Sequence, residues 1–94
     1  MSLGDIRKEI DAVDEQIVKL FLKRMDISKE IALEKEKTGE PVTNPARERE
    51  VLERVSYMSG DEMREYTIEL YHTLFCLSKA YQRTLVEKGA LADE

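Results

Sequence analysis

The chain has 94 residues, of which 41% are apolar and 37% are charged, and its formal net charge is −5. A chain of this length forms one domain with a modest core, so we expect residues 1–94 to be a single helical domain that gains stability from a second copy. The acidic balance argues against nucleic acid as the main partner, and no apolar run approaches the ~18 residues of a membrane span.

The longest predicted element is a helix over about residues 4–37. Apolar side chains recur at helical spacing from Leu3 to Ile31. Gly39 predicts the end of the helix, because glycine commonly takes the position after the last helical residue. A helix of this length is roughly 50 Å long, which exceeds the diameter of a compact 94-residue globule. The overhang needs a partner to cover it, so it points to a dimer.

Two cations interrupt the apolar stripe of this helix. Arg24 and Lys35 lie in register with Ile6 and Ile17. Because burial of an unpaired charge costs several kcal/mol or more, they predict an anionic group opposite, and we expect a small dicarboxylate. Two plainer interpretations also fit: the side chains reach out of a loosely packed stripe into solvent, or they form a structural ion pair with Glu48.

Two further helices are predicted over about residues 45–58 and 62–87. Asn44 and Pro45 suit the cap and the first position of the second helix, and Gly60 marks the turn before the third. Glu48 lies in the inward stripe, either as a site residue or as a carboxylate favoured by the helix N-terminus. No strand pattern occurs, so the expected fold class is all-α, with three helices. Residues from Gly89 onward are expected to fray.

The sequence lacks the patterns of several common chemistries. It has no Cys/His cluster with zinc spacing, no glycine-rich phosphate loop and no plausible triad around His72. We therefore expect neither metal nor cofactor, and an enzyme of this sequence would act by positioning and electrostatics. Cys76 is alone, so an internal disulfide is impossible and the cytoplasm is the expected compartment.

The spacing of the cations suggests how a ligand is held. Arg24 and Lys35 are three helical turns apart, roughly 16 Å in height, so their long side chains could grip the two ends of a small anion. Arg7 lies roughly 25 Å from Arg24 along the helix and cannot reach the same pocket within one chain. In a two-fold dimer, the overhanging helix could deliver Arg7 to the pocket of the other subunit.

The order and spacing of these residues resemble a known family, the all-helical AroQ-type chorismate mutases. The resemblance covers nearly the whole chain and is carried by Ile6-Arg7-Lys8-Glu9-Ile10-Asp11, Asp14, Lys23-Arg24, Lys35, Pro45-Ala46-Arg47-Glu48-Arg49-Glu50, and Ser78 with Gln82. It implies an intertwined homodimer of three-helix subunits. It also implies the unimolecular rearrangement of chorismate to prephenate, on the route to phenylalanine and tyrosine.

The resemblance also implies roles for the polar residues around the ether oxygen and the carboxylates of the substrate. Arg24 and Arg7 of the partner subunit would clamp carboxylates. Lys35 would contact a carboxylate and the ether oxygen, and Gln82 would donate to that oxygen. On spacing alone, Gln82 and Ser78 could equally form a polar helix edge.

The remaining carried-over positions lie at the start of the second helix and on the third. Glu48 would bind the ring hydroxyl, and Arg47 and Ser78 would complete the anion-binding side. Asn44 stands where family members often have aspartate, and it also suits a helix cap, so its role as a ligand stays open.

Two other function classes remain open from the sequence. An isochorismate-pyruvate lyase would share the fold and much of the cationic pocket, although Glu48 together with Gln82 favours the mutase. A non-catalytic dimerisation or regulatory module would have little reason to keep inward-facing cations. Assays with both substrates would separate the three.

Overall fold

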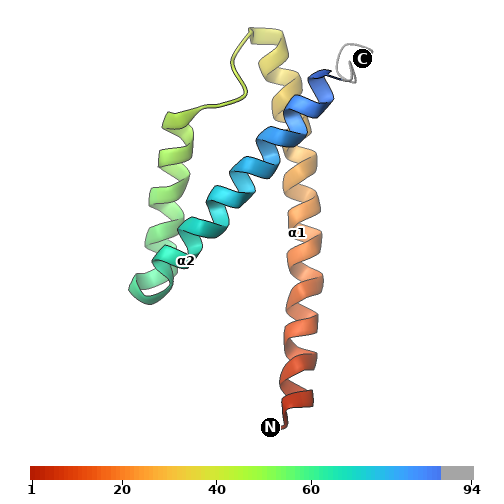
Figure 1. Cartoon of the computed structure of the whole chain (residues 1–94), viewed down its shortest axis with the longest axis vertical. Helices are drawn as coiled ribbons and strands as arrows, with labels where there is room; N and C mark the ends of the chain where they lie inside the picture. The colour runs from red at the N-terminus through yellow and green to blue at the C-terminus, as the bar shows by residue number, and fades with distance from the viewer. Residues whose placement is uncertain (88–94) are drawn as a thin grey trace.

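The computed structural model describes residues 1–87, which form two helical elements, α1 (Leu3–Thr38) and α2 (Pro45–Glu87) (Figure 1). Residues 88–94 lie outside the described part, and so does the segment from Gly89 onward where fraying was expected. Gly60 has non-helical dihedral angles, φ 77° and ψ 167°, which divide α2 into a first arm (residues 45–59) and a second arm (residues 61–87). The all-α fold is confirmed, and the two shorter predicted helices are the two arms of α2.

Local signals in the sequence define both ends of α1. The Ser2 hydroxyl accepts from the backbone N–H of Asp5 at 3.1 Å, and the Asp5 carboxylate accepts from the backbone N–H of Ser2 at 3.3 Å, which is a capping box. At the other end Gly39 takes a left-handed conformation with φ 76°, and its N–H donates to the carbonyl of Lys35. The predicted glycine cap is confirmed.

The arrangement leaves much of α1 uncovered. The second arm of α2 crosses the C-terminal half of α1, whereas the N-terminal half extends alone beyond it (Figure 1). Every residue from Met1 to Leu20 is exposed. The radius of gyration is 16.7 Å, compared with about 12 Å expected for a compact domain of 94 residues.

Two small apolar clusters hold α2 together and join it to α1. In the first, Ala32 of α1 packs with Leu85 of the second arm. In the second, Val51 and Val55 of the first arm pack against Phe75 of the second. No described side chain falls below 2% exposure, and the accessible surface is 7469 Å², about a third more than a compact protein of this mass exposes. Within residues 1–87, no helix has both the length and the apolar character of a membrane span.

We predict that Gly60→Ala destabilises the protein. The φ and ψ of Gly60 lie in a region that only glycine occupies readily, so alanine there costs about 1–3 kcal/mol. Added bulk is not the cause, because no heavy atom lies within 4 Å of a Cβ built at this position. The measurement is the urea unfolding midpoint at fixed protein concentration. Gly4→Ala, within α1, is the control and should leave the midpoint unchanged or slightly raised; equal effects of both changes would contradict the prediction.

Candidate active site

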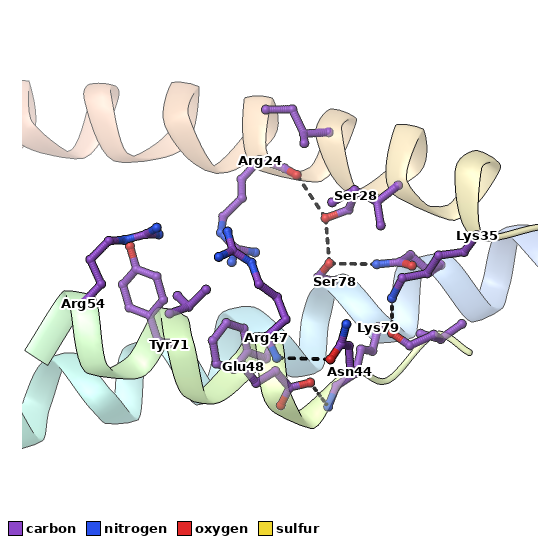
Figure 2. A pocket seen from close by; sticks show the side chains of 16 residues that line it. Arg24, Ser28, Lys35, Asn44, Arg47, Glu48, Arg54, Tyr71, Ser78 and Lys79 are labelled. Atoms are coloured by element: carbon purple, nitrogen blue, oxygen red, sulfur yellow. Dashed lines mark hydrogen bonds and ion pairs between the residues drawn. The ribbon is translucent and has the colours of Figure 1, made fainter. Parts of the chain in front are cut away.

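A cavity of about 390 Å³ lies between the C-terminal half of α1 and both arms of α2 (Figure 2). Seven of the eight predicted site residues line it: Arg24, Lys35, Asn44, Arg47, Glu48, Ser78 and Gln82. The eighth, Arg7, is exposed in the N-terminal half of α1 and does not line this cavity. The fold therefore gathers the predicted residues from three segments of the chain and leaves Arg7 for a separate explanation.

The charge of the cavity opposes the charge of the chain. Among the described residues, five bases line the cavity, namely Arg24, Lys35, Arg47, Arg54 and Lys79. Glu48 is the one acidic residue among the lining residues, in a chain of net charge −5. Basic groups gathered in a concave site create a local positive potential that attracts anions.

Arg24 is held by aromatic rings rather than by an acid. Its guanidinium carbon lies 5.9 Å from the ring centroid of Tyr71 and 5.9 Å from that of Phe75, both on the second arm. This distance is within the range of a cation–π contact. Arg24 is half-buried and, within residues 1–87, forms no ion pair, so its charge remains available to a ligand.

Lys35 is anchored by the chain that connects the two helices. Its ammonium Nζ donates to the backbone carbonyl of Val42 at 2.7 Å. An ammonium carries three donors, so this bond fixes the position of the charge and leaves further donors for the cavity. Lys35 therefore lines the cavity with its side chain half-buried and its charge held in place.

The carboxylate of Glu48 pairs with Lys79, not with Arg24 or Lys35. The distance from Lys79 Nζ to Glu48 Oε2 is 3.1 Å, and the two side chains are 21% and 27% exposed. The pair joins the first turn of α2 to the second arm (Figure 2). The structural pair considered from the sequence therefore exists with a different cation, which the sequence analysis did not single out.

A chain of three hydrogen-bonding side chains runs from α1 to Gln82. The Ser28 hydroxyl donates to the carbonyl of Arg24 at 3.0 Å, and the hydroxyls of Ser28 and Ser78 are 2.6 Å apart. Gln82 Nε2 donates to Ser78 Oγ at 3.2 Å. Gln82 is only 4% exposed, and its Oε1 is buried without a hydrogen-bond partner among the described residues. An unpaired buried acceptor is costly, which marks Gln82 Oε1 as a point where a further contact is missing.

Asn44 acts as the cap of α2. Its Oδ1 accepts from the backbone N–H of Arg47 at 3.1 Å, which confirms the predicted cap. The guanidinium of Arg47 forms an exposed pair with Glu50, at 3.3 Å. Exposed pairs of this kind contribute little, so Arg47 can exchange Glu50 for a ligand at small cost.

The sequence analysis missed five polar, charged or aromatic residues of the cavity wall: Ser28, Arg54, Tyr71, Phe75 and Lys79. Two of them had a usable signal. Ser28 follows Arg24 by one helical turn, and Lys79 precedes Gln82 by three residues, so each shares a helix face with a predicted site residue. Among residues 1–87 no group of three or more His, Cys, Asp or Glu side chains is placed to hold a metal ion.

Comparison with known proteins identifies the family of the chain. Residues 6–83 match the family described as chorismate mutase type II. The chain is 30% identical over 88 residues to a protein of Methanocaldococcus jannaschii named chorismate mutase, covering 92% of this chain and 89% of that protein. It is 34% identical over 83 residues to a bifunctional chorismate mutase/prephenate dehydratase of Aquifex aeolicus, covering 81% of this chain and 23% of that one. No solved structure matches significantly.

The fold and the site thus define a class of protein: all-helical, with a cationic cavity between the helices. The family match spans most of the chain, and the chain belongs to the chorismate mutase type II (AroQ) family. Its activity is that of a chorismate mutase, an isomerase of aromatic amino acid biosynthesis.

We predict that Asn44→Ala lowers the free energy of unfolding by about 1 kcal/mol, because it removes the acceptor that caps α2. Asn44→Asp should keep the stability, since aspartate caps equally well and its charge suits the helix N-terminus. Urea denaturation of the three proteins checks this. A loss of stability in the aspartate variant as large as in the alanine variant would contradict the capping role.

Proposed function

We propose that the cavity binds chorismate as a dianion and rearranges it to prephenate in the cytoplasm, and that a second copy of the chain completes the site. The observation that carries the proposal is the concentration of positive charge: five bases and one acid line the cavity of an acidic chain. A dicarboxylate would offset the charges that Arg24 and Lys35 carry at half-buried positions.

The reaction needs positioning more than it needs chemical groups. In this rearrangement one C–O bond breaks as a C–C bond forms, and the substrate must first adopt a compact conformer that brings its two carboxylates together. Arg24 supplies one fixed cation, held by Tyr71 and Phe75, and Lys35 supplies another, held by Val42. Cations at fixed points offset the repulsion between the carboxylates and favour the reactive conformer.

Negative charge grows on the ether oxygen in the transition state, and Lys35 and Gln82 are the proposed donors to it. A half-turn of the Gln82 carboxamide would direct Nε2 to the place that Oε1 now occupies and would bring Oε1 to Ser78 Oγ. Ser78 would then donate to Oε1, and the Ser28 hydroxyl would donate to Ser78 in place of the Arg24 carbonyl. The buried Oε1 would then have a partner, and Nε2 could donate to the ligand. The missing contact at Gln82 supports this assignment.

The polar groups on α2 take the remaining contacts. Glu48, as an ionised carboxylate, accepts the hydrogen of the ring hydroxyl. Arg47 and Ser78 complete the anion-binding side, and Asn44 contributes by holding the start of the helix that carries Glu48.

The exposed half of α1 supports the dimer. Six of its apolar residues, Leu3, Ile6, Ile10, Val13, Ile17 and Leu20, are each 47–65% exposed. An apolar face of this extent is typical of an interface between subunits. Together with the surface excess of about a third, it favours an intertwined homodimer of three-helix subunits. In this dimer Arg7 of the partner subunit reaches the cavity and clamps a carboxylate.

The experiment that tests the function is the loss of chorismate absorbance on mixing with purified protein, with the product identified. Prephenate supports the proposal. Turnover of isochorismate with release of pyruvate, without prephenate from chorismate, would assign the related lyase instead.

We predict that Arg24→Ala lowers kcat/KM for chorismate by about 10²–10³-fold, as loss of one preorganised charged donor does in other sites. Helix content should be unchanged, because Arg24 belongs to neither apolar cluster and its truncation leaves the members of both clusters in place. Circular dichroism and steady-state kinetics are the measurements. Arg64→Ala is the control, since Arg64 lies outside the cavity in an exposed pair with Asp61. Turnover that survives Arg24→Ala undiminished would end the assignment.

The shared site makes a separate prediction. Arg7→Ala and Arg24→Ala should each keep no more than about 1% of wild-type activity alone, but chains co-expressed in equal amounts should recover about a quarter of wild-type activity. Half of the dimers are then mixed, and one of the two sites in each mixed dimer is intact. The control mixes Arg24→Ala with Lys35→Gln; both changes lie in the same cavity, so no intact site forms. Equal activity of the two mixtures would show that Arg7 does not act across the dimer.

A further inference from the structure

The pair between Lys79 and Glu48 differs from three other ion pairs found within residues 1–87. The pairs Lys37–Glu34, Arg47–Glu50 and Arg64–Asp61 each join residues three apart on one helix, with side chains 48–95% exposed. The pair of Lys79 and Glu48 spans 31 positions in the sequence, joins the two arms of α2, and is 21% and 27% exposed. It is therefore more shielded from solvent and more fixed in geometry than a surface pair.

The pair also lies at the wall of the cavity. Lys79 precedes Gln82 by three residues, so the two share a face of the second arm, and both line the cavity together with Ser78. Glu48 comes from the first turn of α2. The salt bridge thus connects the helix start that Asn44 caps to the segment that carries Ser78 and Gln82.

In a cavity that attracts anions, a carboxylate can bind only a few kinds of ligand group. An ionised glutamate only accepts hydrogen bonds, so it cannot bind the carboxylates of a ligand. The useful partner for Glu48 is a ligand hydroxyl. A glutamate side chain has three torsions, and an unanchored one spends much of its binding energy on becoming ordered. Lys79 engages Oε2, which leaves Oε1 available to accept from a ligand.

We propose that Lys79 is a positioning residue that holds the Glu48 carboxylate in place to accept the ring hydroxyl of the substrate, and so determines specificity for that hydroxyl. This inference rests on the proposed function. It assigns Lys79 no contact with the reacting atoms. Its effect should therefore appear in the discrimination between substrates with and without the hydroxyl, not in the rearrangement itself.

The test compares kcat/KM for chorismate with kcat/KM for an analogue that lacks the ring hydroxyl. Both compounds are dianions, so a change of charge at position 79 affects both alike and cancels in the ratio. A hydrogen bond to a charged acceptor gives a ratio on the order of ten- to a hundredfold in the wild-type protein. We expect Lys79→Met, which keeps most of the side-chain stem, to reduce this ratio by about fivefold or more.

Three variants complete the design. Lys79→Arg restores a cation beside Glu48 and should keep the ratio within about twofold of wild type. Lys37→Met removes a lysine from an exposed Lys–Glu pair of similar length, 3.2 Å, outside the cavity, and should leave the ratio unchanged. In a Glu48→Ala background, Lys79→Met should change the ratio by less than about twofold, because there is no carboxylate left to position.

Each outcome decides a separate point. An unchanged ratio in Lys79→Met would overturn the inference, and so would an equal fall in the Glu48→Ala background, which would mean that Lys79 contacts the hydroxyl itself. A wild-type ratio near one would also overturn it, while leaving chorismate turnover in place. Absence of turnover in the wild-type protein would instead refute the proposed function. Partial unfolding of a variant does not affect the ratio, because both substrates report only the folded enzyme.

Discussion

The structure depends on positive side chains held at half-buried positions around one cavity. Such groups repel one another, and two of them, Arg24 and Lys35, are positioned by contacts that fix the charge without neutralising it. Arg24 rests against two aromatic rings and Lys35 is tied to a backbone carbonyl. Neither contact supplies a negative charge. The cavity therefore keeps a strong attraction for anions, and the protein keeps an unfavourable self-energy that a bound dianion would relieve.

The packing of the chain serves this cavity rather than a central core. The two apolar clusters bracket it along the second arm, where Phe75 lies before Ser78 and Gln82, and Leu85 lies after them. Each cluster is too small to stabilise a domain, as the lack of any fully buried side chain in the described residues indicates. The small size of the apolar clusters and the uncovered apolar face of α1 have one cause: α2 packs against only the C-terminal half of α1. Both favour the proposed assembly of two chains.

The sequence predicted the elements well because their signals are local. The caps at Gly39 and Asn44 and the break at Gly60 each depend on neighbouring residues. The cations on α1 were also predictable, because a charge within an apolar stripe breaks a periodic pattern. The contact of Phe75 with Arg24 was not predictable, since no period relates the two residues. Lys79 shares a helix face with Gln82, but no period relates it to Glu48, so its ion pair was not predictable either. Their roles follow from how α2 folds back at Gly60, which is a tertiary fact.

Glu48 and Gln82 place two different polar groups, a carboxylate and a neutral amide, in a cavity that favours anions. The neighbours of each group explain why both are compatible with an anion site. A free carboxylate in this cavity would repel the ligand, but the ammonium of Lys79 makes the pair neutral while leaving an acceptor. A free cation at position 82 would add to an already strong repulsion among bases, whereas a neutral amide donates without charge. In both cases the side chain is held by a neighbour on the second arm, Lys79 for Glu48 and Ser78 for Gln82. In the proposed complex, recognition of a dianion that also carries a hydroxyl and an ether oxygen thus depends on the second arm as much as on the cations of α1.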